Sequence, residues 1–306
     1  MIPRMGKLSS EQLKAFALSE CKADLAGIAS ADRFAGAPNG QRPGDFLPGC
    51  RSIIVLAVGV PDGALQAIMR KREDGLDSVH GIYGSYGYVG GPNYTLLFGA
   101  DKMARFIENK TGEIATPCPA GPTHGAKMIS LRHAAVAAGL GTFGWHSIVI
   151  SPEYGTRNRF AAILTTAEFE PDPLYDGPEL CNPEKCGVCA GICPNGSIPK
   201  YNEGEKVSVE IGEKTYTYCK FRFDPCTVAG QGLFGDGAVA AIAEGRGKPG
   251  PPDPKTEPNN SFFIHFTSWK CGFCMAYCPA GGWAKHFPKQ GLTRINLKEY
   301  MNGAPR

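Results

Sequence analysis

The fold of this chain depends on the stretch Cys181-Asn-Pro-Glu-Lys-Cys186-Gly-Val-Cys189-Ala-Gly-Ile-Cys193-Pro194. A second stretch, Cys271-Gly-Phe-Cys274-Met-Ala-Tyr-Cys278-Pro279, repeats its ending. In both, two cysteines are separated by two residues, a third follows after three more, and proline comes directly after it. The first stretch also has four residues between Cys181 and Cys186, which we expect to form a surface bulge. Such spacing indicates thiolates that bind metal.

Both stretches resemble the cluster-binding loops of bacterial ferredoxins, in which the last cysteine of each run ligates the other cluster. The resemblance implies two [4Fe-4S] clusters. Cluster A would take Cys181, Cys186, Cys189 and Cys278, and cluster B would take Cys193, Cys271, Cys274 and one more thiolate. The alternative is a pair of structural zinc sites, because paired Cys-x2-Cys elements also hold zinc. Zinc sites do not need the three-residue spacing or the Cys-Pro ending, so we favour iron and sulfur.

The remaining ligand of cluster B is open between Cys226 and Cys219. Cys226 follows Phe223-Asp224-Pro225, which we interpret as a loop stiffened by proline. Cys219 ends an alternating run from Lys214 and is expected to point into a sheet. We favour Cys226 as the ligand.

The composition is typical of a globular protein with room for two domains. The chain has 306 residues, of which 42% are hydrophobic, and its 40 glycines and 25 prolines indicate many turns. A joint rich in Pro and Asp between Pro171 and Gly177 marks a boundary. We therefore expect one domain over residues 1–172 and a second over 173–306, with an inserted loop at 227–268.

The charge balance and the N-terminus lead to expectations about location and partners. A net charge of +3 gives no electrostatic argument for nucleic acid or for an anionic membrane. The first residues lack the apolar core of a signal peptide and a twin arginine, and no apolar run reaches about 18 residues. We expect a cytoplasmic protein of an anaerobic cell, with no nucleic-acid partner and no membrane partner.

Periodicity predicts a mixture of helices and strands. Ser9-Ser-Glu-Gln12 has the spacing of a capping box and opens a helix to about Lys22. Further helices are predicted from Asn93 to just before Gly112 and over 131–138, and strands over 25–29, 53–60, 147–151 and 160–164. The segment 81–94 alternates tyrosine with glycine and is interpreted as a loop.

A longer run carries a second resemblance: Ala138-Gly-Leu-Gly-Thr-Phe-Gly-Trp-His-Ser-Ile-Val-Ile-Ser-Pro152-Glu-Tyr-Gly-Thr-Arg-Asn-Arg159. Together with the first cysteine stretch, it resembles the cobalamin-dependent reductases, which comprise reductive dehalogenases and epoxyqueuosine reductases. The resemblance covers roughly 88–279. It implies an α+β fold, with a nitroreductase-like domain that binds base-off cobalamin followed by a two-[4Fe-4S] ferredoxin-like domain. It also implies eight residues that contact the corrin: Gly139, Leu140, Gly141, Trp145, His146, Ser147, Tyr154 and Gly155.

The same resemblance implies an oxidoreductase that takes electrons from a low-potential donor such as ferredoxin or flavodoxin. Its substrate would be a small organic molecule, reduced by dehalogenation, deoxygenation or a similar elimination. The proton donor is open among His124, Tyr88 and Tyr94, with Tyr83 and Tyr86 as further candidates. His124 stands in the loop where the epoxyqueuosine reductases carry a catalytic aspartate.

Two departures from the family narrow the expected activity. No acidic residue occurs between Cys118 and Met128, so we expect no reduction of epoxyqueuosine in transfer RNA. The missing twin arginine argues against an exported respiratory dehalogenase. Two rival functions stay open: an iron-sulfur electron-transfer protein that reduces another corrinoid or redox protein, and a reductase with flavin in place of cobalamin.

Overall fold

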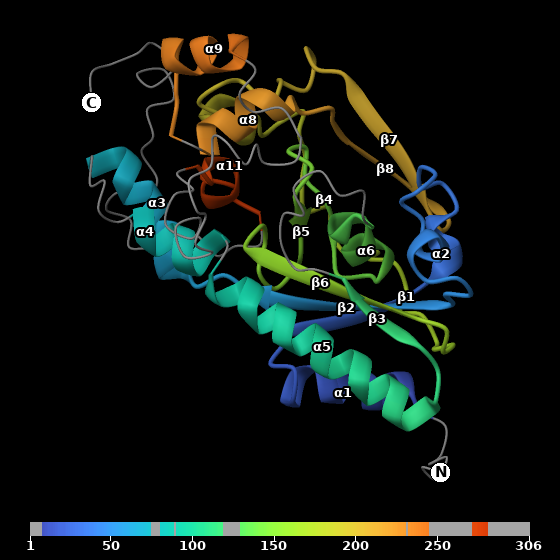
Figure 1. Cartoon of the computed structure of the whole chain (residues 1–306). Coiled ribbons are helices and arrows are strands. Elements are labelled where there is room, and N and C mark those ends of the chain that lie inside the picture. Colours follow the sequence, from blue (N-terminus) through green and yellow to red (C-terminus); the bar gives the residue numbers. More distant parts are fainter. Residues whose placement is uncertain are drawn as a thin grey trace.

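The computed structural model describes residues 8–74, 80–88, 90–118, 129–230, 232–244 and 271–280 (Figure 1). The helices, including the 3-10 segment η1 and the π-helical segment η3, are α1 (Ser10–Ser19), η1 (Ala31–Phe34), α2 (Pro43–Phe46), α3 (Asp62–Asp74), α4 (His80–Tyr83), η3 (Gly84–Tyr88), α5 (Gly91–Thr111), α6 (Leu131–Ala137), α7 (Val188–Ile192), α8 (Phe223–Gly230), α9 (Asp236–Ala243) and α11 (Phe273–Ala276). The strands are β1 (Leu25–Ser30), β2 (Ser52–Gly59), β3 (Ala115–Cys118), β4 (Thr142–Phe143), β5 (Val149–Ile150), β6 (Asn158–Thr165), β7 (Lys206–Ile211) and β8 (Lys214–Cys219).

A four-stranded antiparallel sheet in the order β1-β2-β6-β3 forms the centre of the fold (Figure 1). Its inner strands β2 and β6 are almost continuously apolar, because helices cover both faces of the sheet. Two smaller antiparallel pairs, β4-β5 and β7-β8, lie outside it. Helices combined with antiparallel sheets confirm the expected mixture of α and β structure.

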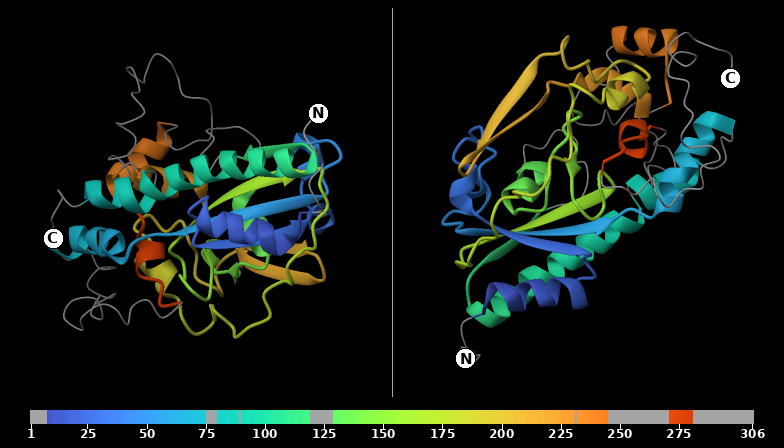
Figure 2. Two further views of the ribbon diagram at one scale, coloured as in Figure 1. Left: turned by 90° about the horizontal axis from the view of Figure 1, so that it is seen from below. Right: turned by 180° about the vertical axis from the view of Figure 1, so that it is seen from behind.

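Helices α1 and α5 pack against one face of this sheet (Figure 2). The capping box of α1 is present, because Ser9 Oγ accepts from the Gln12 N–H at 3.2 Å and Gln12 Oε1 accepts from the Ser9 N–H at 3.0 Å. The helix ends at Ser19, before the expected Lys22, which has φ 58°. Helix α5 ends as expected, with Gly112 at φ 75° as its cap.

The other face of the sheet is covered by α6 and by the β7-β8 hairpin. The alanine-rich α6 packs against β1, β2 and β6, and Phe143, Ile211 and Tyr216 extend the same apolar cluster from β4 and the hairpin. Residues of the proposed second domain thus bury part of the first domain's core.

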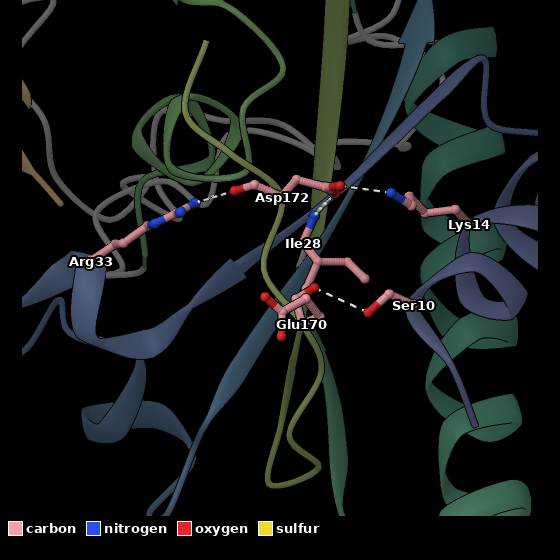
Figure 3. A network of polar contacts seen from close by, with 6 residues as sticks. All are labelled: Ser10, Lys14, Ile28, Arg33, Glu170 and Asp172. Carbon is pink, nitrogen blue, oxygen red and sulfur yellow. Dashed lines mark hydrogen bonds and ion pairs between the residues drawn. The ribbon is translucent and has the colours of Figure 1, made fainter. Parts of the chain in front are cut away.

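The joint between the proposed domains is bonded to the sheet through Asp172 (Figure 3). Its N–H donates to Ile28 O at 2.8 Å, and its Oδ2 accepts from the Ile28 N–H at 2.9 Å. Lys14 Nζ lies 2.6 Å from Asp172 Oδ1, and Arg33 Nη1 donates to Asp172 O at 2.7 Å. The division at residue 172 stays a prediction.

Two segments expected as loops are helical. The tyrosine and glycine segment forms α4, the π-helical η3 and the start of α5. Its glycines permit close turns, because a Cβ at Gly87 would lie 2.5 Å from Tyr83 Cδ2 and one at Gly90 would lie 1.9 Å from Ser85 O. Phe223–Gly230 forms α8, because Pro225 stands in the first turn, where its missing N–H costs no helical bond.

Other sequence expectations have mixed outcomes. The predicted strand at 147–151 is reduced to β5, and Ser147 has φ 61°. Most of the expected inserted loop at 227–268 lies outside the described residues, as do His124 and the rest of 119–128. Within the described ranges, no helix has the length and apolar character needed to cross a membrane.

Candidate metal centre

Four cysteines from two segments far apart in the sequence line one small cavity. Cys181 and Cys186 precede α7, Cys189 lies in it, and Cys278 follows α11. Gly187, at φ 65°, forms the N-cap of α7 and allows the chain to turn there. These four residues are the set expected for cluster A.

Trp145 closes this cavity on the side of the first domain. Its indole is only 3% exposed, and its backbone N–H points to Cys181 Sγ at 3.4 Å. Its Nε1 donates to Pro199 O at 2.7 Å, and its ring packs edge-on against Tyr201 at 5.0 Å. The indole is therefore fixed in place as part of the cavity wall.

Burial and neighbouring thiols raise the pKa values of Cys181, Cys189 and Cys278. Desolvation raises the pKa of Cys189, and the thiols of Cys278, Cys181 and Cys186 raise it further. Desolvation also raises the pKa of Cys278 to about 12. Four thiolates here need a positive charge between them, which an iron-sulfur core supplies.

The donor set of this cavity is four thiols. Four thiolates around one space are the ligands of a [4Fe-4S] core, so these residues fit that group. In the described part of the chain, no group of three His, Cys, Asp or Glu side chains is placed to hold a single metal ion.

A second group of cysteines surrounds Cys274 in α11. Desolvation raises the pKa of the Cys274 thiol well above its ordinary value, and Cys271, Cys226 and Cys193 raise it further. Cys193 Sγ accepts from the Ser197 N–H at 3.1 Å. The four residues expected for cluster B are thus near one another, and Cys189 of the first group also raises the pKa of Cys274.

Cys219 lies between the two groups. It is fully buried at the end of β8, and its N–H donates to Trp145 O at 2.9 Å. Burial raises its thiol pKa to about 12, and Cys193 raises it as well. Cys226, in contrast, raises the pKa of the Cys274 thiol. The choice of Cys226 as a ligand stays a prediction.

The glycines expected to contact a corrin serve internal packing. A Cβ at Gly139 would lie 2.2 Å from Pro173 O, and one at Gly141 would lie 2.1 Å from Ile150 O. Gly155 exchanges two backbone hydrogen bonds with Ser151, both at 2.9 Å. These glycines permit close approach of the chain to itself.

The remaining corrin candidates have varied surroundings. Trp145 and His146 line the cluster A cavity. Ser147 Oγ accepts from Arg132 at 2.6 Å, Arg157 lies 5.3 Å over the Tyr154 ring, and Leu140 packs into the core beside Gly27. None of these contacts marks the outline of a corrin.

Two of the candidate proton donors lie beside the second cysteine group. Tyr83 is 2% exposed, and its pKa is raised by desolvation and by Cys274 and Cys271. Arg159 lies 4.8 Å over the Tyr88 ring, whose hydroxyl pKa desolvation also raises. Tyr94 stacks with Phe98 at 6.4 Å, away from these thiols, and Tyr86 is 57% exposed.

Sequence reasoning missed two half-buried basic residues on α6. Arg132 donates to Ser147 O at 2.9 Å and lowers the thiol pKa values of Cys226 and Cys219. His133 contacts Ser130 Oγ at 2.7 Å and the Tyr218 hydroxyl at 3.0 Å, beside a cavity of about 270 Å³. The available signal was an adjacent Arg and His in a helix otherwise made of small apolar residues.

Comparison with known proteins shows that the chain is similar to two groups of reductases. The chain is 30% identical over 188 residues to an epoxyqueuosine reductase of Staphylococcus aureus, and the match covers 58% of this chain and 44% of that protein. It is 34% identical over 125 residues to a tetrachloroethene reductive dehalogenase of Dehalobacter restrictus, over 39% of this chain and 21% of that protein. The chain is a relative of both groups of reductases. The expected resemblance to these reductases is thereby confirmed.

The chain spans less than half the length of either of these two proteins. A solved epoxyqueuosine reductase, bound to an epoxyqueuosine-modified tRNA stem loop, is 17% identical with a TM-score of 0.49. That alignment covers 87% of this chain and 80% of the other. No family model matches the chain.

One expectation is wrong. The small net charge led us to expect no nucleic-acid partner, but the relatives of this chain include epoxyqueuosine reductases, which makes a nucleic-acid partner the better expectation. Net charge is a poor guide here because it averages over the whole surface.

Proposed function

We propose that this protein is a reductase that holds two [4Fe-4S] clusters and works with cobalamin. The observation that supports this proposal is that one cavity is lined by Cys181, Cys186 and Cys189 from the first stretch and by Cys278 from the second. Spacing already favours iron and sulfur over two independent zinc sites, and this exchange of the last cysteine is the ferredoxin arrangement. When bound, cobalamin supplies a strongly reducing cobalt.

The two cysteine groups share α7 and α11, which supports electron transfer between them. Cys189 in α7 belongs to the first group, and Cys193, at the end of that helix, belongs to the second. Cys274 and Cys278 stand in the same relation around α11, and the two helices pack together. Two clusters held in this way are neighbours and pass single electrons in series.

Electrons would enter at Cys186. It is exposed, whereas Cys189 and Cys278 are buried, so cluster A comes nearest to solvent on that side. A low-potential protein donor such as ferredoxin or flavodoxin would dock there. Trp145, which belongs to the proposed first domain, is buried and lines the same cavity.

The relatives suggest two substrate classes: a modified tRNA and a chlorinated ethene. Either reaction also needs a proton, for which Tyr83 and Tyr88 are the described candidates nearest to the cysteines. Both hydroxyls are protonated at neutral pH, and their raised pKa values make them weaker acids than an ordinary tyrosine.

A second candidate function is electron delivery to another corrinoid protein. The observation that favours it concerns three glycines that we expected to contact a corrin. Gly139, Gly141 and Gly155 instead lie in close contact with the protein's own backbone.

One experiment separates these functions. Protein purified and reconstituted without oxygen is analysed for iron, sulfide and retained corrin, and then assayed with epoxyqueuosine-modified tRNA stem loop and with tetrachloroethene. The proposal expects about eight irons and eight sulfides per chain, bound corrin and turnover of one substrate. Clusters without bound corrin would support electron delivery, and zinc with little iron would exclude both.

A further inference from the structure

His146 has one ring nitrogen with a partner and one without. Its Nδ1 accepts from the Ile148 N–H at 3.1 Å, and its Nε2 is buried with no hydrogen-bond partner. A ring whose Nδ1 accepts must carry its proton on Nε2 when it is neutral. The side chain is 5% exposed, so water does not satisfy this donor from bulk solvent.

The backbone contacts of the ring lie at Nδ1 and Cε1. A Cβ at Gly144 would lie 2.4 Å from His146 Cε1 and 2.9 Å from Nδ1, and Nδ1 also accepts from Ile148. His146 lines the cavity of Cys181, Cys186, Cys189 and Cys278. Its Nε2 is buried without a partner in the protein, and the ring is beside this cavity.

Burying a hydrogen-bond donor without an acceptor is destabilising, which points to a partner that binds at this site. In this cavity the arriving acceptors are the sulfur atoms of a cluster. We propose that the His146 Nε2–H donates a hydrogen bond to a sulfur atom of cluster A. This inference rests on the proposed function, because it needs the cluster.

Such a bond sets how readily cluster A takes an electron. Reduction adds negative charge to the sulfur atoms, and a donor stabilises that charge, so it raises the reduction potential. His146 is thus a positioning residue for electron transfer. It favours cluster A as the acceptor of electrons from the external donor.

The test uses the reconstituted full-length protein with selectively ¹⁵N-labelled histidine. Pulsed paramagnetic resonance on the reduced protein should show a ¹⁵N coupling to the cluster in the wild type. The coupling should disappear in His146→Leu and persist in His133→Leu, a matched control whose two ring nitrogens already have protein partners. Absence of the coupling in the cluster-loaded wild type would overturn the inference.

A redox titration gives the second readout. His146→Leu should make cluster A harder to reduce by about tenfold in its equilibrium constant, which is about 59 mV for one electron. His146→Gln, which keeps an N–H donor, should recover most of this shift, and His133→Leu should show none. An unchanged potential in His146→Leu at full iron content would overturn the inference alone, whereas a wild type without iron would overturn the proposed function.

Discussion

Asp172 and Ile28 exchange two hydrogen bonds, from backbone to backbone at 2.8 Å and from the Ile28 N–H to the carboxylate at 2.9 Å. The same carboxylate pairs with Lys14, so the joint after β6 is attached to both β1 and α1. Asp172→Ala leaves the Ile28 N–H without its carboxylate acceptor and Lys14 without its partner. We expect a loss of about 1–3 kcal/mol, seen as a lower thermal unfolding midpoint.

Asp172→Asn serves as the graded control. It keeps an oxygen for the Ile28 N–H and loses only the ion pair, so its loss should be smaller. Glu203→Gln removes an exposed pair with Lys200 and should change stability by less than about 0.5 kcal/mol. Equal midpoints for Asp172→Ala and the wild type would show that the joint does not depend on this carboxylate.

Cys278→Ser should remove cluster A and leave cluster B. Iron should fall from about eight to about four per chain, because cluster A would lose one of its four ligands. Cys278 is the one ligand of this set that comes from the second stretch, so the variant tests the exchange of the last cysteine. Cys21→Ser changes a buried thiol outside both groups and should keep all the iron. Iron and sulfide analysis after reconstitution measures both, and full iron in Cys278→Ser would refute this ligand set.

Cys226→Ser should damage cluster B, and Cys219→Ser should not. Cys226 acts on the Cys274 thiol, whereas Cys219 acts on Cys189 and Cys193 from between the groups. The paramagnetic resonance signal of cluster B after reduction reports on both variants. If the signal is lost only in Cys219→Ser, the fourth ligand is Cys219 and the pairing of the two stretches still holds.

Gly272→Ala should disturb cluster B through packing. A Cβ at this position would lie 2.0 Å from the Tyr83 hydroxyl oxygen, and Tyr83 is too deeply buried to move aside. We expect a loss of about 1–3 kcal/mol and reduced iron, because Cys271 and Cys274 flank the site. Gly63→Ala, in α3 with nothing within 4 Å of the added carbon, should keep stability and iron.

Stability should fall in acid partly through His133. Desolvation, together with Arg132, lowers its pKa from 6.5 to about 4. Between these values the unfolded chain binds a proton that the folded chain does not, so stability is lost as the pH falls from about 6.5 towards 4. The contribution is on the order of 2 kcal/mol, because the ring is only partly buried. In His133→Gln, the slope of the unfolding midpoint against pH should be shallower, and an identical slope would contradict this assignment.

The sequence determined the features that depend on neighbouring residues. The capping box at Ser9 and Gln12 and the left-handed cap at Gly112 follow from contacts within about four residues. The apolar runs of β2 and β6 follow from burial on both faces. The cysteine spacing belongs to this class as well, because a run of thiolates around α7 is a local pattern.

Tertiary structure decided what depends on residues far apart in the chain. The helical turns from Tyr83 to Tyr88 form against local propensity, because tertiary packing overrides it. The meeting of Cys278 with Cys181, and the unpartnered Nε2 of His146 beside them, exist only once α7 and α11 pack together. Burial and electrostatic surroundings are sums over such distant neighbours, and no local pattern records them.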